Sequence, residues 1–533
     1  MRRPHRSTLS RVKLLLASLG RGLPPPLRRV FRSLVSRSVM AGVRHLPAET
    51  VTGFDAWAVQ DELAATIVDV ARANGIDAVR LSRSGREWVA IDARQRRAAI
   101  LALQDSPCAA WVTSAGGRPR RLSTLDPDLV GRELRVFRHL RAPSGAYLAG
   151  SEVSVQLQFW RTIRTTTHRP DGGDFELGTR VAPVRNQVAP YLAPGQWDAA
   201  RSHRHGRPPA QRLPHLLEVN EPVDAVYTWV DGADHAWQAD RAAHWPSPDG
   251  LAADALDPAR TRDRDELRYS LRSLEMYANW IGKVWIVTSG QVPEWLRTDH
   301  PRLQVVSQAE IFTDPGVLPV FNSHAIESQL HHIPGLAEHF LYLNDDFFFG
   351  RPVRPELFFH GNGLPKMMTS PIAIDLDLES EARNGATLAA RRGREWLEQR
   401  FGRTVTNRMR HVPHAHLTSA LADLEAAAPD DVARVAASKF RHRDDLSIPS
   451  ELGHYYGYAT GRTVTGSLAF EYIDLDSPLA PERLAALLAT RSADCFCVND
   501  VGGGATSLAG SAQLAGFFEE YFPLPSAFER GQR

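Results

Sequence analysis

The sequence contains little cysteine, and the few it has form no recognisable framework. Only 3 of its 533 residues are cysteine: Cys108 stands alone, and Cys495 and Cys497 lie two positions apart in an apolar run. Three such residues cannot build a disulfide scaffold or complete a four-ligand zinc site. We expect them to be small buried residues in a reducing compartment, which favours the cytoplasm.

The composition also lacks the extremes of fibrous and disordered proteins. Hydrophobic residues make up 43% of the chain and charged residues 23%, and the mean hydropathy is −0.29. These values are typical of an ordinary globular protein. At this length the chain is expected to form two to four domains, each able to bury its own core.

Acidic residues are absent from the first 48 positions, which form a basic tail. This stretch carries eleven arginines and lysines, and Glu49 is the first acid. Because the whole chain has a net charge of +2, removing these eleven charges leaves about −9 for residues 49–533. A mildly acidic body argues against nucleic acid as a partner.

The tail has no apolar run long enough to span a bilayer. Its apolar stretch at residues 14–19 is short and closely flanked by basic residues. No small-residue cleavage site follows, which disfavours a secretory signal. Leucines between arginines suit the anionic inner face of the plasma membrane, so we expect peripheral membrane contact there. An unstructured basic extension is the alternative.

The remaining sequence divides into two patterns joined by a linker. Residues 50–195 are predicted to form an α+β accessory module with helices over 55–75 and 93–103, and residues 196–220 a linker rich in arginine, histidine and proline. Residues 221–525 alternate short apolar runs with helical periodicity. This alternation predicts an α/β catalytic domain with a mostly parallel, Rossmann-like sheet, whose ligands bind beyond the carboxyl ends of the strands.

Asp345 and Asp346 are the most informative local feature of the second pattern. They follow the buried apolar run at residues 340–343. Two adjacent carboxylates there are costly unless a cation or hydrogen-bond donors compensate. Mg²⁺ or Mn²⁺ would compensate them, with one aspartate as the direct ligand because successive strand residues point to opposite faces. An exposed turn is the alternative.

Three further clusters are candidates for phosphate and proton chemistry. Asn322, Ser323 and His324 open a predicted helix, whose free N–H groups favour a phosphate, although a simple helix cap is the alternative. Arg264 and Arg268 recur at a spacing of four, which suits either a pyrophosphate clamp or a solvated face. His411 suits removal of a hydroxyl proton, because an imidazole titrates near neutral pH.

Four segments in order resemble the Stealth family of sugar-1-phosphate transferases. They are VDAVYTWVDG at 223–232; DELRYSLRS at 265–273, continuing through FNSHAIE at 321–327 to FLYLNDD at 340–346; HVPH at 411–414 with KFRHRDD at 439–445; and FCVND at 496–500. The arrangement, with an extra amino-terminal module, is similar to actinobacterial exopolysaccharide phosphotransferases of the CpsY type.

The resemblance implies transfer of a sugar-1-phosphate from a UDP-sugar to a saccharide hydroxyl, with release of UMP, in exopolysaccharide or capsule synthesis. It implies catalytic roles for His411, Arg441, Asp346 and His324; donor binding by Asp231, Arg264, Arg268, Asn322 and Ser323; and a divalent metal held by Asp345, Asp346 and Asp474. His411 would be the general base, and Arg441 would stabilise charge on the phosphoryl group.

Three other functions remain open from the residues alone. A metal-dependent glycosyltransferase could use the same acidic pair and would release UDP. A non-catalytic polysaccharide-assembly protein would tolerate loss of Asp346 or His411. A metal-dependent phosphodiesterase would consume the UDP-sugar without an acceptor. Homo-oligomer formation is also left open.

Overall fold

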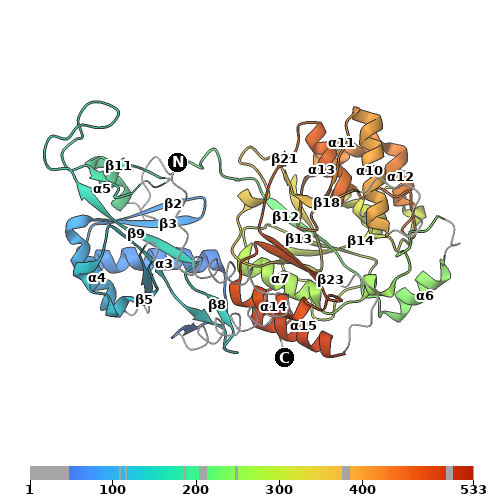
Figure 1. Ribbon diagram of the computed structural model, residues 1–533, viewed down its shortest axis with the longest axis horizontal. Helices are drawn as coiled ribbons and strands as arrows, with labels where there is room; N and C mark the ends of the chain where they lie inside the picture. Colours follow the sequence, from blue (N-terminus) through green and yellow to red (C-terminus); the bar gives the residue numbers. More distant parts are fainter. Residues whose placement is uncertain are drawn as a thin grey trace, which may run out of the picture. The chain divides into compact units, whose positions relative to one another are not determined.

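The computed structural model describes residues 47–106, 110–114, 117–184, 186, 188–202, 213–245, 250–374, 384–499 and 508–531. The chain divides into two compact units, one ending at Leu216 and the other beginning at Leu217, with Leu488–Thr490 grouped with the first (Figure 1). The predictions for Cys108 and for the tail before residue 47 fall outside the described residues. Within them, no helix is long and apolar enough to cross a membrane.

The first unit packs two helices, α3 (Ala56–Ala73) and α4 (Arg96–Gln104), with a mixed sheet. Asp55 caps α3 by accepting the N–H groups of Trp57 and Ala58. The strands of this unit are β1 (Glu49–Thr50), β2 (Ala78–Arg83), β3 (Arg86–Asp92), β4 (Trp111–Thr113), β5 (Arg120–Arg121), β6 (Glu133–Phe137), β7 (Leu140–Arg141), β8 (Tyr147–Ala149), β9 (Ser154–Thr162), β10 (Arg180–Val181) and β11 (Tyr191–Leu192). Its core contains Leu63, Ile67, Ile100 and Leu157.

The predicted linker begins too early. Pro194–Ser202 forms helix α5, and its Trp197 side chain is fully buried against Trp160. The predicted linker residues from 196 to Ser202 are therefore folded as part of the first unit. The polar composition of this stretch predicted a linker, but burial of the large Trp197 side chain stabilises a helix here despite its polar neighbours.

The second unit is built on a five-stranded sheet in the order β14-β13-β12-β15-β20. The strands are β12 (Val223–Thr228), β13 (Val284–Thr288), β14 (Leu303–Ser307), β15 (His339–Asn344) and β20 (His414–Leu417). The first four are mutually parallel and β20 is antiparallel, so the domain is mixed α/β. The apolar runs of β12, β13 and β15 are buried on both faces, as in other sheets covered by helices, whereas β14 at the edge of the sheet exposes Gln304.

The remaining elements of this unit surround that sheet. Figure 1 shows α10 to α13 above the strands and α7, α14 and α15 below them. The helices are α6 (His235–Ala243), α7 (Glu266–Tyr277), α8 (Gln308–Ile311), α9 (Ser323–Glu327), α10 (Gly385–Phe401), α11 (Thr418–Ala427), α12 (Pro429–Ala436), α13 (Gly453–Ala459), α14 (Ala480–Thr490) and α15 (Leu508–Tyr521). Smaller sheets are made by β16 (Phe347–Phe349), β17 (Lys366–Met367), β18 (Thr369–Ala373), β19 (Asn407–Met409), β21 (Val464–Thr465), β22 (Phe470–Asp474) and β23 (Cys495–Asn499).

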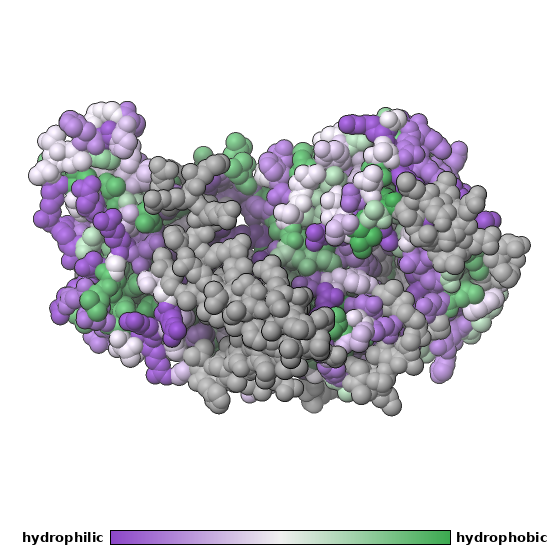
Figure 2. All heavy atoms as spheres, in the orientation of Figure 1, coloured by the Kyte–Doolittle hydropathy of each residue, from purple (hydrophilic) through white to green (hydrophobic). Residues whose placement is uncertain are grey.

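The surface mixes polar and apolar residues. On the face shown in Figure 2, hydrophilic residues are interspersed with small hydrophobic areas. Such mixing is ordinary for globular proteins, in which apolar atoms contribute much of the accessible surface.

Candidate active site

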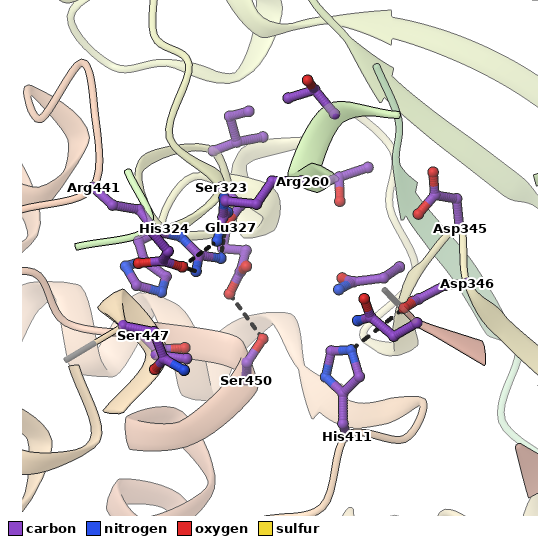
Figure 3. Close-up of a pocket in the computed structure, with 18 of the residues that line it drawn as sticks. Arg260, Ser323, His324, Glu327, Asp345, Asp346, His411, Arg441, Ser447 and Ser450 are labelled. Carbon is purple, nitrogen blue, oxygen red and sulfur yellow. Dashed lines mark hydrogen bonds and ion pairs between the residues drawn. The ribbon is translucent and has the colours of Figure 1, made fainter. Parts of the chain in front are cut away.

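A cavity of about 790 Å³ opens at the carboxyl ends of β12 and β15 (Figure 3). In register, Thr228 at the end of β12 pairs with Asn344 at the end of β15, so the two strands finish level with each other. β13 and β14 extend the sheet on one side of β12, whereas β15 lies on the other. Ligands of open α/β sheets bind at such a reversal of strand order.

The loop after β12 holds one wall of the cavity in place. Gly232 donates its N–H to Thr261 O at 2.8 Å, and a Cβ at this position would meet the same oxygen at 2.2 Å. The close approach therefore requires glycine. It fixes the segment around Thr261 that supplies Arg260, Arg264 and Glu266 to the cavity.

Carboxylates gather on one side of the cavity. Burial, together with the charges of Asp346, Glu266 and Asp263, raises the pKa of Asp345 well above its ordinary value. Burial likewise raises the pKa of Glu266 to about 7, and Asp263 adds to the rise. Arg264 Nη1 lies 3.6 Å from Glu266 Oε1 and partly offsets this rise. Because burial and neighbouring carboxylates still raise the pKa of Asp345, this side of the cavity favours a positively charged ligand.

One carboxylate oxygen of Asp346 is hydrogen-bonded, and the other has no partner among the described residues. Its Oδ2 accepts a hydrogen bond from Cys497 Sγ at 3.1 Å and lies 3.8 Å from His411 Nε2. Its Oδ1 is buried and has no hydrogen-bond partner among the described residues. A buried carboxylate oxygen without a partner is costly, and a divalent cation is a fitting occupant.

His411 is the histidine best placed to meet a substrate. It follows β19, lines the cavity, and its side chain is 37% exposed. Its ring packs edge-on against Phe347 with the centroids 4.5 Å apart. In contrast, His414 is buried, with its Nδ1 2.9 Å from His454 Nε2, and burial lowers its pKa well below the ordinary value. Both histidines line the cavity, but His414 is buried and held neutral, whereas His411 is exposed enough to meet a substrate.

Two arginines share one carboxylate on another wall of the cavity. Arg260 Nη1 and Arg441 Nη1 donate to Asp254 Oδ2 at 2.9 and 3.1 Å, and Arg441 Nη2 donates to Ser323 Oγ at 2.9 Å. Burial, followed by the charge of Arg441, lowers the pKa of Arg260 to about 9, which leaves it cationic at neutral pH. The charges of Asp254 and Glu327 act on both guanidinium groups. Guanidinium groups placed at a cavity in this way are suited to bind an anionic ligand such as a phosphate.

Figure 3 shows these two groups on different sides of the close-up, with Arg260, Arg441, Ser323 and Glu327 on one side and Asp345, Asp346 and His411 on the other. Glu327 Oε2 accepts a hydrogen bond from Ser450 Oγ at 2.8 Å. The cavity therefore presents cationic and acidic walls to the same space.

The predicted trio Asn322, Ser323 and His324 divides between the cavity and its support. Ser323 and His324 line the cavity. Asn322 is fully buried behind them: its Nδ2 donates to Asp445 Oδ2 at 2.8 Å, and its Oδ1 caps α9 by accepting the His324 N–H. His324 Nδ1 lies 3.3 Å from the same Asp445 oxygen. The structure therefore gives Asn322 a positioning role in place of the predicted donor contact.

Three other predicted site residues do not line the cavity. Arg268 pairs instead with Glu529, 2.7 Å away. Asp231 accepts the N–H of Ala233, and Asp474 accepts the N–H of Asp476, so each carboxylate closes its own turn. The predicted clamp role of Arg268 and the predicted ligand roles of Asp231 and Asp474 therefore gain no geometric support and stay predictions. Arg264 does line the cavity.

Several cavity residues were missed from the sequence. Asp254 and Arg260 lie in an irregular segment without periodicity, and no local pattern marks them. Glu266 and Cys497 stand inside the segments that resemble the family, but no local pattern marks them as neighbours of the acidic pair. Their adjacency to the acidic pair depends on long-range packing, because Cys497 lies opposite Phe347 in the pairing of β16 with β23.

Comparison with protein families matches four conserved regions, all at or after residue 221. Stealth protein conserved region 1 matches residues 221–243, region 2 matches 260–367, region 3 matches 398–458 and region 4 matches 485–533. An exopolysaccharide phosphotransferase of Streptomyces coelicolor is 41% identical over 409 residues, which cover 73% of this chain and 67% of the relative.

The chain belongs to the Stealth family. The exopolysaccharide phosphotransferase CpsY of Mycobacterium tuberculosis is 37% identical over 404 residues, covering 75% of this chain and 73% of CpsY. A second Streptomyces coelicolor exopolysaccharide phosphotransferase is 42% identical over 404 residues; it is longer, and the chain matches 42% of its length. The resemblance predicted from the sequence is confirmed.

The four Stealth regions together supply the cavity of this chain. Region 1 contains the end of β12, region 2 contains Asp345 and Asp346, region 3 contains His411 and Arg441, and region 4 contains Val498 and Asn499. Asp254 lies between regions 1 and 2, outside both. The carboxylate that joins the two cavity arginines is thus contributed by a segment that the family regions do not include.

Proposed function

We propose that this Stealth phosphotransferase transfers a sugar-1-phosphate from a UDP-sugar to the hydroxyl of a saccharide acceptor, forming a phosphodiester and releasing UMP. Its family makes it an enzyme of exopolysaccharide synthesis; the donor, the leaving group and the residue roles are the proposal. The strand order around β12 and β15 supports the Rossmann-like interpretation of the sheet.

The observation that carries the proposal is the pairing of opposite charges in one cavity. A sugar nucleotide brings a diphosphate, which needs cationic partners on more than one side. Arg260 and Arg441 offer guanidinium groups on one wall. Asp345 and Asp346 offer carboxylates on another, where an added cation would meet the same diphosphate. The cavity volume lies within the range of small-molecule sites.

The residues assign the chemical step as follows. The His411 imidazole takes the proton from the acceptor hydroxyl, and the acceptor oxygen bonds to the phosphorus that carries the sugar. The bond from that phosphorus to the bridging oxygen breaks, UMP leaves, and the anomeric bond of the sugar stays intact. Arg441 and Arg260 stabilise the negative charge on the transferred group, as cations do in phosphoryl transfer.

A divalent cation, Mg²⁺ or Mn²⁺, fits the acidic wall. Asp346 would hold it through its open Oδ1, with Asp345 beside it. When bound, the ion would neutralise phosphate charge and polarise the reacting phosphoryl group. Glu266 adds negative charge nearby, and His411 is free for its proton-transfer role at the exposed face of the cavity.

The leaving group tests the proposal directly. Purified protein is supplied with Mg²⁺ or Mn²⁺, a saccharide acceptor and a panel of UDP-sugars, and nucleotide products are separated chromatographically. At least one donor should yield UMP, and His411→Ala should lower UMP release about 100- to 10,000-fold while UDP-sugar binding persists. Release of UDP would identify a glycosyltransferase and contradict the proposal, as would UMP formation without an acceptor or unchanged turnover in the variant.

The location and partners of the enzyme extend the same proposal. A UDP-sugar donor places the reaction in the cytoplasm, and acceptors for surface polysaccharide are handled at the membrane face. The eleven basic residues of the first 48 would hold the enzyme there by attraction to anionic lipids. Homo-oligomer formation stays a prediction.

A further inference from the structure

Away from the cavity, two consecutive histidines and a glutamate from separate segments converge on one point. His331 and His332 lie in the short turn η7 (Leu330–His332), and Glu425 lies in α11. His331 Nε2 is 2.6 Å and His332 Nε2 is 2.8 Å from the same oxygen, Glu425 Oε2. The two rings stand 4.1 Å apart between centroids. None of the three residues lines the cavity.

These three side chains form a set of donors that transition metals prefer. Two imidazole nitrogens and one carboxylate oxygen all lie within 4.8 Å of one another. Neutral imidazole and carboxylate are standard ligands of Zn²⁺, and two histidines with a glutamate leave a fourth position for water. The His332 and Glu425 side chains are 30% and 25% exposed, so solvent reaches this position.

The present contacts are short enough to be opened by a small movement. A tetrahedral ion bound to all three would separate the ligand atoms to about 3.3 Å from one another, because zinc bonds to nitrogen and oxygen measure about 2.0–2.1 Å. His331 is fixed by its nearly complete burial, with 3% of its side chain exposed. The other two side chains are exposed enough to rotate outward by the fraction of an ångström that this requires.

We propose that His331, His332 and Glu425 bind one Zn²⁺ ion as a structural site, separate from the catalytic cavity. The ion would fasten η7, which precedes β15, the strand that ends just before Asp345 and Asp346, to α11, which follows the strand carrying His414. It thereby ties conserved region 2 to conserved region 3. The site is independent of which sugar nucleotide the enzyme uses.

Calorimetric titration with Zn²⁺ tests this site on the full chain, freed of any histidine tag and stripped with EDTA. The second cluster of donors, around Asp346, is removed by using Asp346→Asn as the parent protein. This parent should bind one Zn²⁺ per chain and gain several degrees in unfolding temperature when Zn²⁺ is in large excess over the dissociation constant. His332→Ala and Glu425→Gln should each weaken binding at least tenfold and abolish that gain.

A control variant and a variant-free measurement complete the test. His360→Asn replaces an exposed histidine elsewhere in the second unit and should bind Zn²⁺ as its parent does. In the parent itself, Zn²⁺ should protect His332 from acylation by diethyl pyrocarbonate, measured by peptide mass. Absence of Zn²⁺ binding, binding that survives both ligand variants, or modification of His332 unaffected by Zn²⁺ would each overturn the site and leave only a histidine–glutamate contact.

Discussion

Two groups of buried charge in the second unit differ in how completely they are paired. Where α7 meets the carboxyl-terminal segment, Arg268 and Arg272 both bond Glu529, and Arg272 also donates to Phe522 O. In the cavity, two arginines share a single oxygen of Asp254, and Asp346 keeps a buried oxygen without a partner in the described structure. In the first group Arg272 bonds through all three of its guanidinium nitrogens. In the cavity, Arg441 Nε and Asp346 Oδ1 are both buried without a hydrogen-bond partner among the described residues, so this group keeps polar atoms for a ligand.

The difference shows why helix position alone does not assign a function to an arginine. Arg264, Arg268 and Arg272 recur at a spacing of four, and only Arg264 lines the cavity. A complete set of internal partners marks a structural charge, and incomplete pairing beside a cavity marks a binding charge. If this division holds, substitutions in the structural group should lower stability, and substitutions in the binding group should lower turnover.

Glu529→Gln should lower stability strongly without affecting chemistry. It removes the nearest anion of Arg272, whose side chain is 5% exposed, and leaves only the more distant and more exposed Glu519, 3.6 Å away. Removing one partner of a buried ion pair costs about 3–5 kcal/mol, measured here by urea unfolding of the second unit. UMP release per folded molecule, assayed well below the unfolding temperature, should match wild type.

The matched control is the exposed pair of Arg297 and Asp299, 3.0 Å apart with side chains 46% and 80% exposed. Asp299→Asn should produce no measurable change in unfolding, because exposed pairs are screened by solvent. A loss of turnover in Glu529→Gln at full folding would show that the fully paired group also serves the cavity, and would break the comparison.

Glu451 allows a second test, through pH. It lines the cavity and accepts the Met409 N–H, and burial raises its pKa to about 7 from 4.5. Between these values the folded state holds a proton that the unfolded state has released, so stability should fall as pH rises from about 4.5 to about 7. Above pH 7 the full penalty, at most about 3 kcal/mol, is present.

Glu451→Gln should remove this contribution, because glutamine keeps an acceptor for the Met409 N–H but carries no charge. Its gain in unfolding free energy over wild type should be near zero at pH 4.5 and largest above pH 7. Glu294→Gln, at an exposed position, should retain the wild-type dependence on pH. Equal gains at pH 4.5 and pH 8 would mean that Glu451 is not held protonated by burial.

The sequence predicted those features that depend on neighbouring residues. The strands β12, β13, β14 and β15 follow from continuous apolar runs, and the placement of Asp345 and Asp346 at a strand end follows from the run before them. Helix length was harder to predict: the helix opened by Asn322, Ser323 and His324 is short, because α9 ends at Glu327 and is followed by the separate turn η7.

Pairing between distant residues could not be predicted from local pattern. The sequence predicts a ligand contact for Arg268 because local pattern cannot reveal its ion-pair partner Glu529, which lies 261 positions away. Asp254 could not be predicted as a site residue because its role depends on the hydrogen bond from Arg441, 187 positions away. A single sequence shows which residues carry charge, but the fold decides which charges neutralise one another.

Asp254→Asn tests the binding charges of the cavity and should have a smaller effect than the two substitutions above. The substitution is nearly isosteric and keeps one acceptor oxygen, but it removes the anion that orients Arg260 and Arg441 and lets the two guanidinium groups repel. We expect UMP release to fall about 10- to 100-fold, because small misplacements of charged groups around a reacting centre have effects of this order. The fall should lie mainly in kcat, since the arginines act on charge that develops during transfer, and Asp254→Glu should restore part of it.

Equal turnover in Asp254→Asn would mean that the arginines hold their positions without the shared carboxylate. A loss of folding without any change in kcat would instead place Asp254 with the structural charges, beside Glu529.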